Sequence, residues 1–87
     1  MRLDKYLKLA RLIKRRTLAK EVAENERVFV NGKPAKPSKE LKLGDEITIE
    51  FGNKSVTVRV ASLEASTKKE DAVHMYEFVS EISKLNK

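Results

Sequence analysis

Two stretches of alternating apolar residues near the middle of the chain limit its fold most. Residues 47–51 (Ile-Thr-Ile-Glu-Phe) and residues 56–60 (Val-Thr-Val-Arg-Val) each place alternate apolar side chains on one face. A period of two is typical of a strand with one buried face. Between them, Gly52-Asn53 suits the positive backbone angles of a tight turn. The sequence therefore predicts an antiparallel hairpin.

Another strand is predicted upstream, over residues 28–30 (Val-Phe-Val), with both valines on one face. Asn31-Gly32 follows it directly and is a strong turn signal. From Lys33 to Lys42 the chain has two prolines and no apolar period. This segment is predicted to be a traversing loop that keeps its four lysines near the surface.

Helical spacing marks both ends of the chain. Apolar residues recur every three or four positions over residues 2–10 and 15–24, which predicts two N-terminal helices. Asp4 would lie in the first turn, where the helix dipole favours a carboxylate. Residues 67–70 have capping-box spacing and precede a predicted C-terminal helix. Its apolar face would carry Ala72, Met75, Tyr76, Val79 and Ile82. The predicted fold class is α+β.

Composition restricts the chain to one small domain. With 87 residues it can bury only one core, and without cysteine it can form neither a disulfide nor a thiolate zinc site. No apolar run approaches the roughly 20 residues of a membrane span, and the start lacks the apolar core of a secretion signal. We expect a cytoplasmic protein with no membrane contact, no metal and no cofactor.

Positive charge is concentrated at the N-terminal end. The first twenty residues hold eight bases and one acid, whereas the other sixty-seven hold eleven bases and twelve acids. Like charges three or four residues apart on a helix cost a few tenths of a kcal/mol each, so a helix that only faces water usually mixes its charges. If the apolar faces pack inward, a ridge of seven bases faces outward: Lys5, Lys8, Arg11, Lys14, Arg15, Arg16 and Lys20.

Such a ridge indicates a polyanionic partner. The planar guanidinium of arginine binds phosphate oxygens in pairs and stacks on exposed bases, which suits folded RNA. A solvated face, an acidic protein or membrane headgroups are the alternatives.

Several separate segments, in the same order, resemble the S4 RNA-binding domain over residues 1 to about 60. They are Arg2-Leu3-Asp4-Lys5-Tyr6-Leu7, residues 28–33, Lys36-Pro37-Ser38 and Gly44-Asp45-Glu46-Ile47. Within this family, residues 11–17, residues 68–70 and the short tail are similar to the stand-alone RqcP-like proteins, which are related to small S4-domain heat-shock proteins.

The resemblance implies an S4-type (αL) fold, in which two N-terminal helices pack on a small, largely antiparallel curved sheet. Residues 1–66 would form the S4 domain, and residues 67–87 a C-terminal helix and tail on the same domain. RqcP-like proteins act in bacterial ribosome-associated quality control, on large ribosomal subunits blocked by peptidyl-tRNA. They contact rRNA and the tRNA, and support alanine tailing of the stalled chain by an RqcH-like tailing factor. A monomer off the ribosome is expected.

The resemblance also implies which residues contact RNA. Matching positions assign phosphate and base contacts to Arg2, Lys5, Arg11, Lys14 and Arg16. Further candidates are Arg15, Lys33 and Lys36. Asp4 would orient an arginine or contact RNA through its polar edge.

One position departs from the family pattern. Glu26 stands where S4 domains commonly have glycine, and Asn25 precedes it. Because asparagine tolerates a left-handed backbone better than most residues, the turn is expected to shift by one position. A carboxylate there would be repelled by phosphate.

An enzyme is not expected. His74 is the only histidine, no glycine-rich phosphate loop or metal-ligand cluster accompanies it, and it is expected in the C-terminal helix. Two alternatives to a tailing factor stay open. One is a rescue factor for large subunits carrying nascent chains without tailing, and the other is a protein-interaction module that docks through its C-terminal helix.

Overall fold

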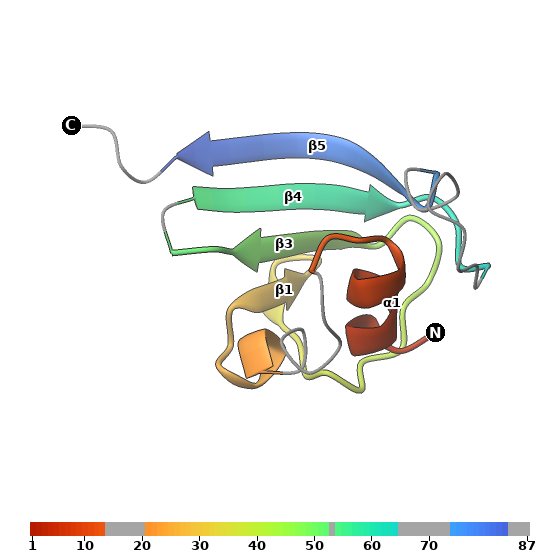
Figure 1. Ribbon diagram of the computed structural model, residues 1–87, viewed down its shortest axis with the longest axis horizontal. Helices are drawn as coiled ribbons and strands as arrows, with labels where there is room; N and C mark the ends of the chain where they lie inside the picture. The colour runs from red at the N-terminus through yellow and green to blue at the C-terminus, as the bar shows by residue number, and fades with distance from the viewer. Residues whose placement is uncertain (14–20, 53, 65–73, 84–87) are drawn as a thin grey trace.

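The computed structural model describes residues 1–13, 21–52, 54–64 and 74–83 (Figure 1). Besides a helical turn over residues 21–24, this part of the chain contains one helix and five strands. They are α1 (Leu3–Leu9), β1 (Val28–Val30), β2 (Lys33–Pro34), β3 (Glu46–Glu50), β4 (Lys54–Val60) and β5 (Tyr76–Ser83). The strands form one sheet in the order β2-β1-β3-β4-β5, and every neighbouring pair is antiparallel.

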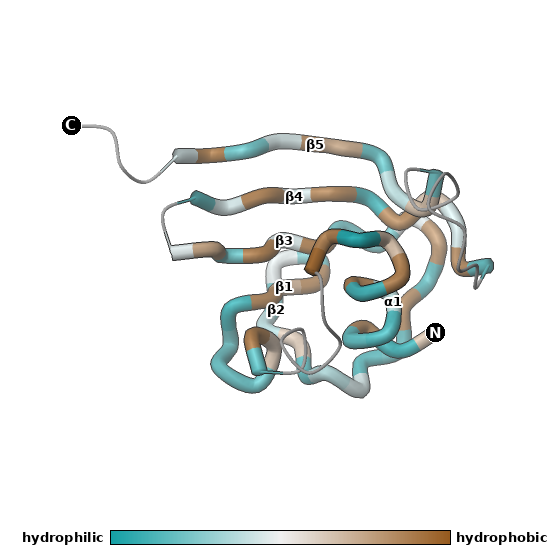
Figure 2. The backbone as a smooth tube through the Cα atoms, viewed as in Figure 1, coloured by the Kyte–Doolittle hydropathy of each residue, from teal (hydrophilic) through white to brown (hydrophobic). Residues whose placement is uncertain are grey.

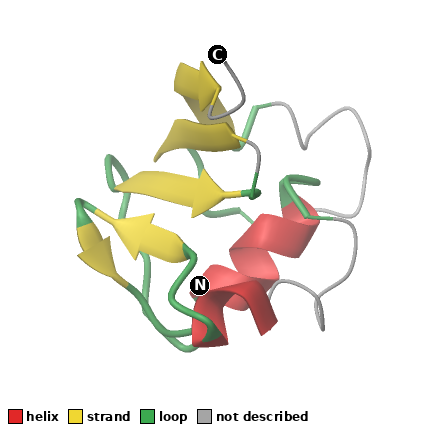
Figure 3. Cartoon of the chain, turned by 90° about the vertical axis from the view of Figure 1, so that its left-hand side faces the viewer, coloured by secondary structure: helices red, strands yellow, loops and turns green. Residues whose placement is uncertain are grey.

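The helical segments pack on one face of the sheet (Figure 3). From α1, Leu3, Tyr6 and Leu7 are fully buried, and the apolar spacing predicted this for Leu3 and Leu7. They belong to the same core cluster as the inward residues of the strands, which include Val28 and Ile47. Figure 2 shows the apolar stretches of the strands beside α1. The second predicted helix lies mostly outside the described residues, although residues 21–24 are helical.

The central hairpin is confirmed. Strands β3 and β4 pair in register from Glu46 opposite Arg59 to Glu50 opposite Ser55. Strand β1 is also confirmed, and it pairs with β3 on its other side.

The segment after Asn31-Gly32 differs in part from the prediction. Instead of a loop from Lys33 onward, Lys33 and Pro34 form β2, which pairs with β1 to close a short hairpin. Pro34 is tolerated there because β2 is an edge strand, so one side of its backbone needs no donor.

The predicted C-terminal helix is wrong over its described part. Residues 76–83 form β5, which pairs along the whole of β4. Between Thr57 and Val58 the register shifts by one residue, leaving Val79 without a partner in a β-bulge. Phe78 and Ile82 therefore face opposite sides of the sheet, opposite Val58 and Ser55. The capping-box residues 67–70 lie outside the described residues.

No helix in the described ranges combines the length and apolar character required to cross a membrane.

Candidate nucleic-acid interface

The outward face of α1 is basic. Lys5 and Lys8 are exposed while Leu3, Tyr6 and Leu7 are buried, because charged and apolar residues occupy opposite sides of the helical repeat. Four other predicted contacts, Lys14, Arg15, Arg16 and Lys20, lie outside the described residues.

Arg11 ends α1 in an unusual backbone conformation. Its φ is 60°, and its amide donates to the carbonyl of Lys8 (3.1 Å) while the amide of Leu12 donates to that of Leu7 (3.0 Å). Left-handed backbone at the end of a helix is usually taken by glycine, because a Cβ there crowds the carbonyl. The conformation keeps the Arg11 side chain exposed beside the basic face of α1.

The side chain of Arg2 is held by a buried carboxylate. Arg2 Nη2 donates to Asp4 Oδ2 (3.2 Å), and Asp4 Oδ1 accepts the backbone N–H of Lys5 (2.8 Å). The Asp4 side chain is only 3 % exposed, whereas that of Arg2 is 48 % exposed. Of the two predicted roles for Asp4, orienting an arginine is the one that this geometry fits.

The start of α1 is docked on the loop that follows β2. The amide of Leu3 donates to the carbonyl of Lys39 (2.8 Å), and that of Asp4 to the carbonyl of Pro37 (3.1 Å). The N-terminal ammonium bonds Glu40 (2.8 Å) and lowers the pKa of that exposed carboxyl. These contacts hold the start of α1, with Arg2, against the segment that directly follows Lys36.

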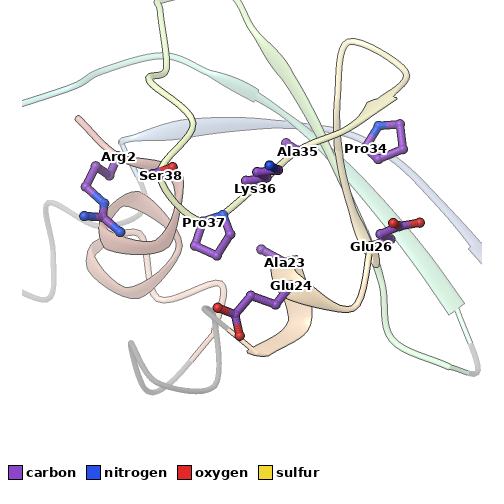
Figure 4. A pocket seen from close by; sticks show the side chains of 9 residues that line it. All are labelled: Arg2, Ala23, Glu24, Glu26, Pro34, Ala35, Lys36, Pro37 and Ser38. Carbon is purple, nitrogen blue, oxygen red and sulfur yellow. The ribbon is translucent and has the colours of Figure 1, made fainter.

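A groove of about 450 Å³ lies at this junction (Figure 4). It runs from Arg2 at the start of α1, past the loop after β2, to the turn that leads into β1. Its lining residues are Arg2, Ala23, Glu24, Glu26, Pro34, Ala35, Lys36, Pro37 and Ser38. A second depression of about 520 Å³ adjoins it across the same loop, and Lys33, Lys36 and Lys39 contribute to its lining. Of the two predicted lysines, Lys36 thus lines the same groove as Arg2, whereas Lys33 lines the second depression together with Lys36.

Glu26 overturns the expectation about the turn before β1. The turn does not shift to Asn25, because Glu26 itself adopts the left-handed backbone, with φ of 59°. The amides on either side close the turn, with Glu26 N–H donating to Ala23 (3.1 Å) and Arg27 N–H to Val22 (3.1 Å). The carboxylate is exposed on the wall of the groove.

Three residues that line these two depressions were not predicted from the sequence to belong to a site: Lys39, Glu24 and Glu26. Lys39 was predicted only to be near the surface, and the departure from glycine at Glu26 was the available signal. His74 is exposed and lies in a turn before β5, not in a helix.

The opposite face of the sheet has a different charge pattern. Arg59 donates to Glu46 (3.0 Å) and to Glu77 (3.2 Å), and these bonds raise its already high pKa. Two glutamates around one arginine leave this part of the sheet net negative, so among the described elements the α1 side is the one suited to a polyanion.

Comparison with known families matches residues 1–47 to the family described as "S4 domain". The chain belongs to the S4 domain family. Relatives of this S4 protein include the "RQC P-site tRNA stabilizing factor" of Bacillus subtilis, 58 % identical over 81 residues that cover 93 % of this chain and 94 % of the relative. The protein of the same name from Streptococcus pneumoniae is 59 % identical over 93 % of this chain and 92 % of its own.

Heat shock protein 15 of Escherichia coli is 39 % identical over 82 residues, covering 93 % of this chain and 62 % of its own. Among solved structures, the trimeric structure of Vibrio cholerae Heat Shock Protein 15 has a TM-score of 0.84 at 33 % identity, over 92 % of this chain and 82 % of that one. This S4 domain therefore has the Heat Shock Protein 15 fold, with its small antiparallel sheet of five strands.

Proposed function

We propose that this protein is a non-catalytic, cytoplasmic RNA-binding factor of ribosome-associated quality control. It would bind the rRNA and peptidyl-tRNA of obstructed large ribosomal subunits as a monomer, and support alanine tailing by an RqcH-like factor. The observation that carries the proposal is 58 % identity, over nearly the whole of both chains, to a relative named RQC P-site tRNA stabilizing factor. The exposed bases around Arg2 supply a physical reason for it.

The proposed contacts come from several segments of the chain. Arg2, Lys5, Lys8 and Arg11 extend along α1 and its two ends, Lys33 lies in β2 and Lys36 in the loop after it. The proposed contacts Lys14, Arg15, Arg16 and Lys20 lie outside the described residues. Charge-assisted bonds to phosphate are among the strongest hydrogen bonds available to a protein surface, and arginine makes them in pairs. Asp4 would act by fixing Arg2.

Of the alternatives, rescue of large subunits without tailing uses the same RNA-binding surface. Docking through a C-terminal helix loses its basis, because residues 76–83 form a strand of the sheet.

The test is sedimentation of the tagged protein from cells in low salt. We expect wild type to migrate with free large subunits that carry peptidyl-tRNA, and an Arg2→Ala/Lys36→Ala variant to lose this association while remaining folded at the temperature of the assay. Lys54→Ala is the control for loss of a base away from the groove, because Lys54 lies in β4, 3.8 Å from Glu81 and with its ammonium 6.0 Å from the centre of the Phe51 ring.

Migration of wild type with intact ribosomes or with no RNA would contradict the proposal. Rescue without tailing would be favoured by two results together. The protein would still bind large subunits in cells that lack the tailing partner, and the stalled chains would not be extended when that partner is present.

A further inference from the structure

We propose that the groove beside Arg2 binds one unpaired guanosine, with Glu26 reading the Watson–Crick edge of the base. The inference deepens the proposed function and rests on it, because it names the kind of nucleotide that this part of the RNA-binding surface accepts.

The groove has the shape of a base-binding slot. Its floor is formed by small or ring side chains, since Ala23 is 2 % and Ala35 8 % exposed and Pro37 is buried. Its volume of about 450 Å³ falls in the range of roughly 300–1,000 Å³ typical of small-molecule sites. Pro34 forms part of the wall next to Glu26 (Figure 4) and offers a rigid apolar surface to a base.

The two cations of this groove and the Glu26 carboxylate occupy different parts of it, and Glu24 lies between the two ends, below Pro37 and Ala23 in the view of Figure 4. Arg2 lies at one end, Lys36 lies along it, and Glu26 lies at the other end beside Pro34 (Figure 4). A nucleotide has the same arrangement, with a charged phosphate at one end and a neutral base at the other. Lys36 and Arg2 can hold successive phosphates while the base points toward Glu26, where no phosphate needs to approach.

Backbone strain at Glu26 supports a role for its side chain. A left-handed backbone is unfavourable for any residue that has a Cβ atom, whereas glycine adopts it without this cost. Asn25, the neighbour of Glu26, is also better suited to this conformation than a glutamate. Within the described residues, the Glu26 carboxylate makes no hydrogen bond or ion pair. Neither the local fold nor an internal contact explains a glutamate here, and strained residues of this kind concentrate at functional sites.

The chemistry of a carboxylate selects guanine. An ionised carboxylate only accepts hydrogen bonds, and its two oxygens match two parallel donors. On the Watson–Crick edge, guanine presents N1–H and N2–H side by side. Adenine and cytosine place an acceptor beside their amino group, and uracil has one N–H between two acceptors. Unpaired bases of folded RNA are commonly read on this edge.

The experiment measures binding of the full chain to three RNA pentamers that differ only at the central base. The probes are UUGUU, UUIUU and UUAUU, where inosine (I) keeps N1–H but lacks the N2 amino group. We expect the guanosine pentamer to bind roughly tenfold more tightly than the adenosine pentamer, the scale of one two-bond base contact, with inosine between them.

Variants of Glu26 separate base reading from charge. Glu26→Gln keeps the side-chain shape and the backbone strain, and it should abolish the preference for guanosine while leaving the adenosine pentamer bound at least as well. Glu26→Gly should lose the same preference without lowering the melting temperature, because it removes the strain. Glu64→Gln also removes one negative charge, from an exposed site beyond β4, and should keep the preference.

Equal affinity of wild type for the three pentamers, or loss of the preference in Glu24→Gln but not in Glu26→Gln, would overturn the inference. Either result is compatible with large-subunit binding through phosphate contacts. Failure of wild type to migrate with large subunits would instead contradict the proposed function, whatever the pentamers show.

Discussion

Arg2 combines exposure with a fixed orientation, which is the property expected of a phosphate-binding side chain. Its guanidinium projects from the surface, yet Asp4 holds one of its nitrogens from below at 3.2 Å. Holding the side chain in advance reduces the conformational entropy that binding would otherwise cost. We therefore expect Asp4 to contribute to affinity by orienting Arg2.

A double-mutant cycle tests this coupling. Arg2→Ala should weaken association with large subunits by about 1.5–3 kcal/mol, the scale of a charged hydrogen bond. Asp4→Asn places an amide N–H group among the donors around Arg2 and should weaken association by about 1 kcal/mol, because Arg2 is no longer oriented. If Asp4 affects binding by orienting Arg2, the double variant should bind no more weakly than Arg2→Ala alone. Additive effects would show that Asp4 acts independently of Arg2.

Arg11 gives a second prediction at the scale of a single residue. With φ of 60°, the arginine is less suited than glycine to its backbone conformation, by roughly 1–2 kcal/mol. Glycine also loses about 0.5–1 kcal/mol more entropy on folding. We expect Arg11→Gly to leave stability unchanged or raise it by up to about 1 kcal/mol, measured by urea unfolding, while RNA affinity falls. A clear decrease in stability would show that the Arg11 side chain has a structural role.

The sequence identified exposed bases more reliably than backbone strain. Lys5 and Lys8 were predicted to face outward because the helical repeat that buries Leu3 and Leu7 leaves them no other position. Glu26 was not predicted to adopt a positive φ, because local preference favours Asn25. The hydrogen bonds that close this turn extend over several residues, and a preference assigned residue by residue does not include them.

At the scale of elements, the β-bulge explains why β5 was predicted to be a helix. A regular strand alternates every two residues, but the unpartnered Val79 shifts the phase. The apolar residues Met75, Val79 and Ile82 then recur at intervals of four and three, which is the spacing of a helix. The β3–β4 hairpin has no register shift, and its alternation was interpreted correctly.

Tyr6 links α1 to β5. It is fully buried, and its hydroxyl donates to the carbonyl of Met75, which also accepts the amides of Ala61 (2.8 Å) and Ser62 (3.1 Å). Because that carbonyl keeps two other donors, Tyr6→Phe leaves no unpaired acceptor. We expect a decrease of only about 0.5–1.5 kcal/mol in the free energy of unfolding, measured in urea. A decrease beyond about 3 kcal/mol would indicate that the hydroxyl has a further role.

The same tyrosine predicts lower stability in alkali. Burial first, and the nearby Tyr76 second, raise the pKa of Tyr6 above its ordinary value. Above about pH 10 the unfolded chain releases this proton while the folded chain retains it, so the stability that is complete below that pH decreases as pH rises. Urea midpoints from about pH 8 to 11 should fall more steeply for wild type than for Tyr6→Phe. Parallel curves for the two proteins would contradict this assignment.

At the scale of the whole molecule, charge is divided between the two faces of the sheet. The exposed bases of α1 and of the loop after β2 lie on the helix side, whereas Glu46 and Glu77 surround Arg59 on the other side. The exposed acids described on the helix side are Glu21, Glu24, Glu26 and Glu40, and Glu40 is paired with the N-terminal ammonium.

This distribution predicts a steep dependence on salt. If about five to eight phosphates are neutralised, the logarithm of the association constant should fall against the logarithm of salt concentration with a slope of roughly −4 to −7. Arg2→Ala and Lys36→Ala should each make the slope shallower by about one unit, because each variant neutralises one phosphate fewer, whereas Lys54→Ala should leave it unchanged. A wild-type slope near zero would exclude phosphate binding as the main source of affinity.

The bond between Tyr6 and Met75 also concerns the order in which the protein is made. Its two partners are 69 positions apart, so the first helix completes its polar contacts only after synthesis has passed residue 75. While residue 75 is still inside the ribosome that makes it, α1 can cover β1 and β3, but its buried hydroxyl lacks its acceptor. Completion of the RNA-binding side of this small domain is thus coupled to the emergence of the segment that forms β5.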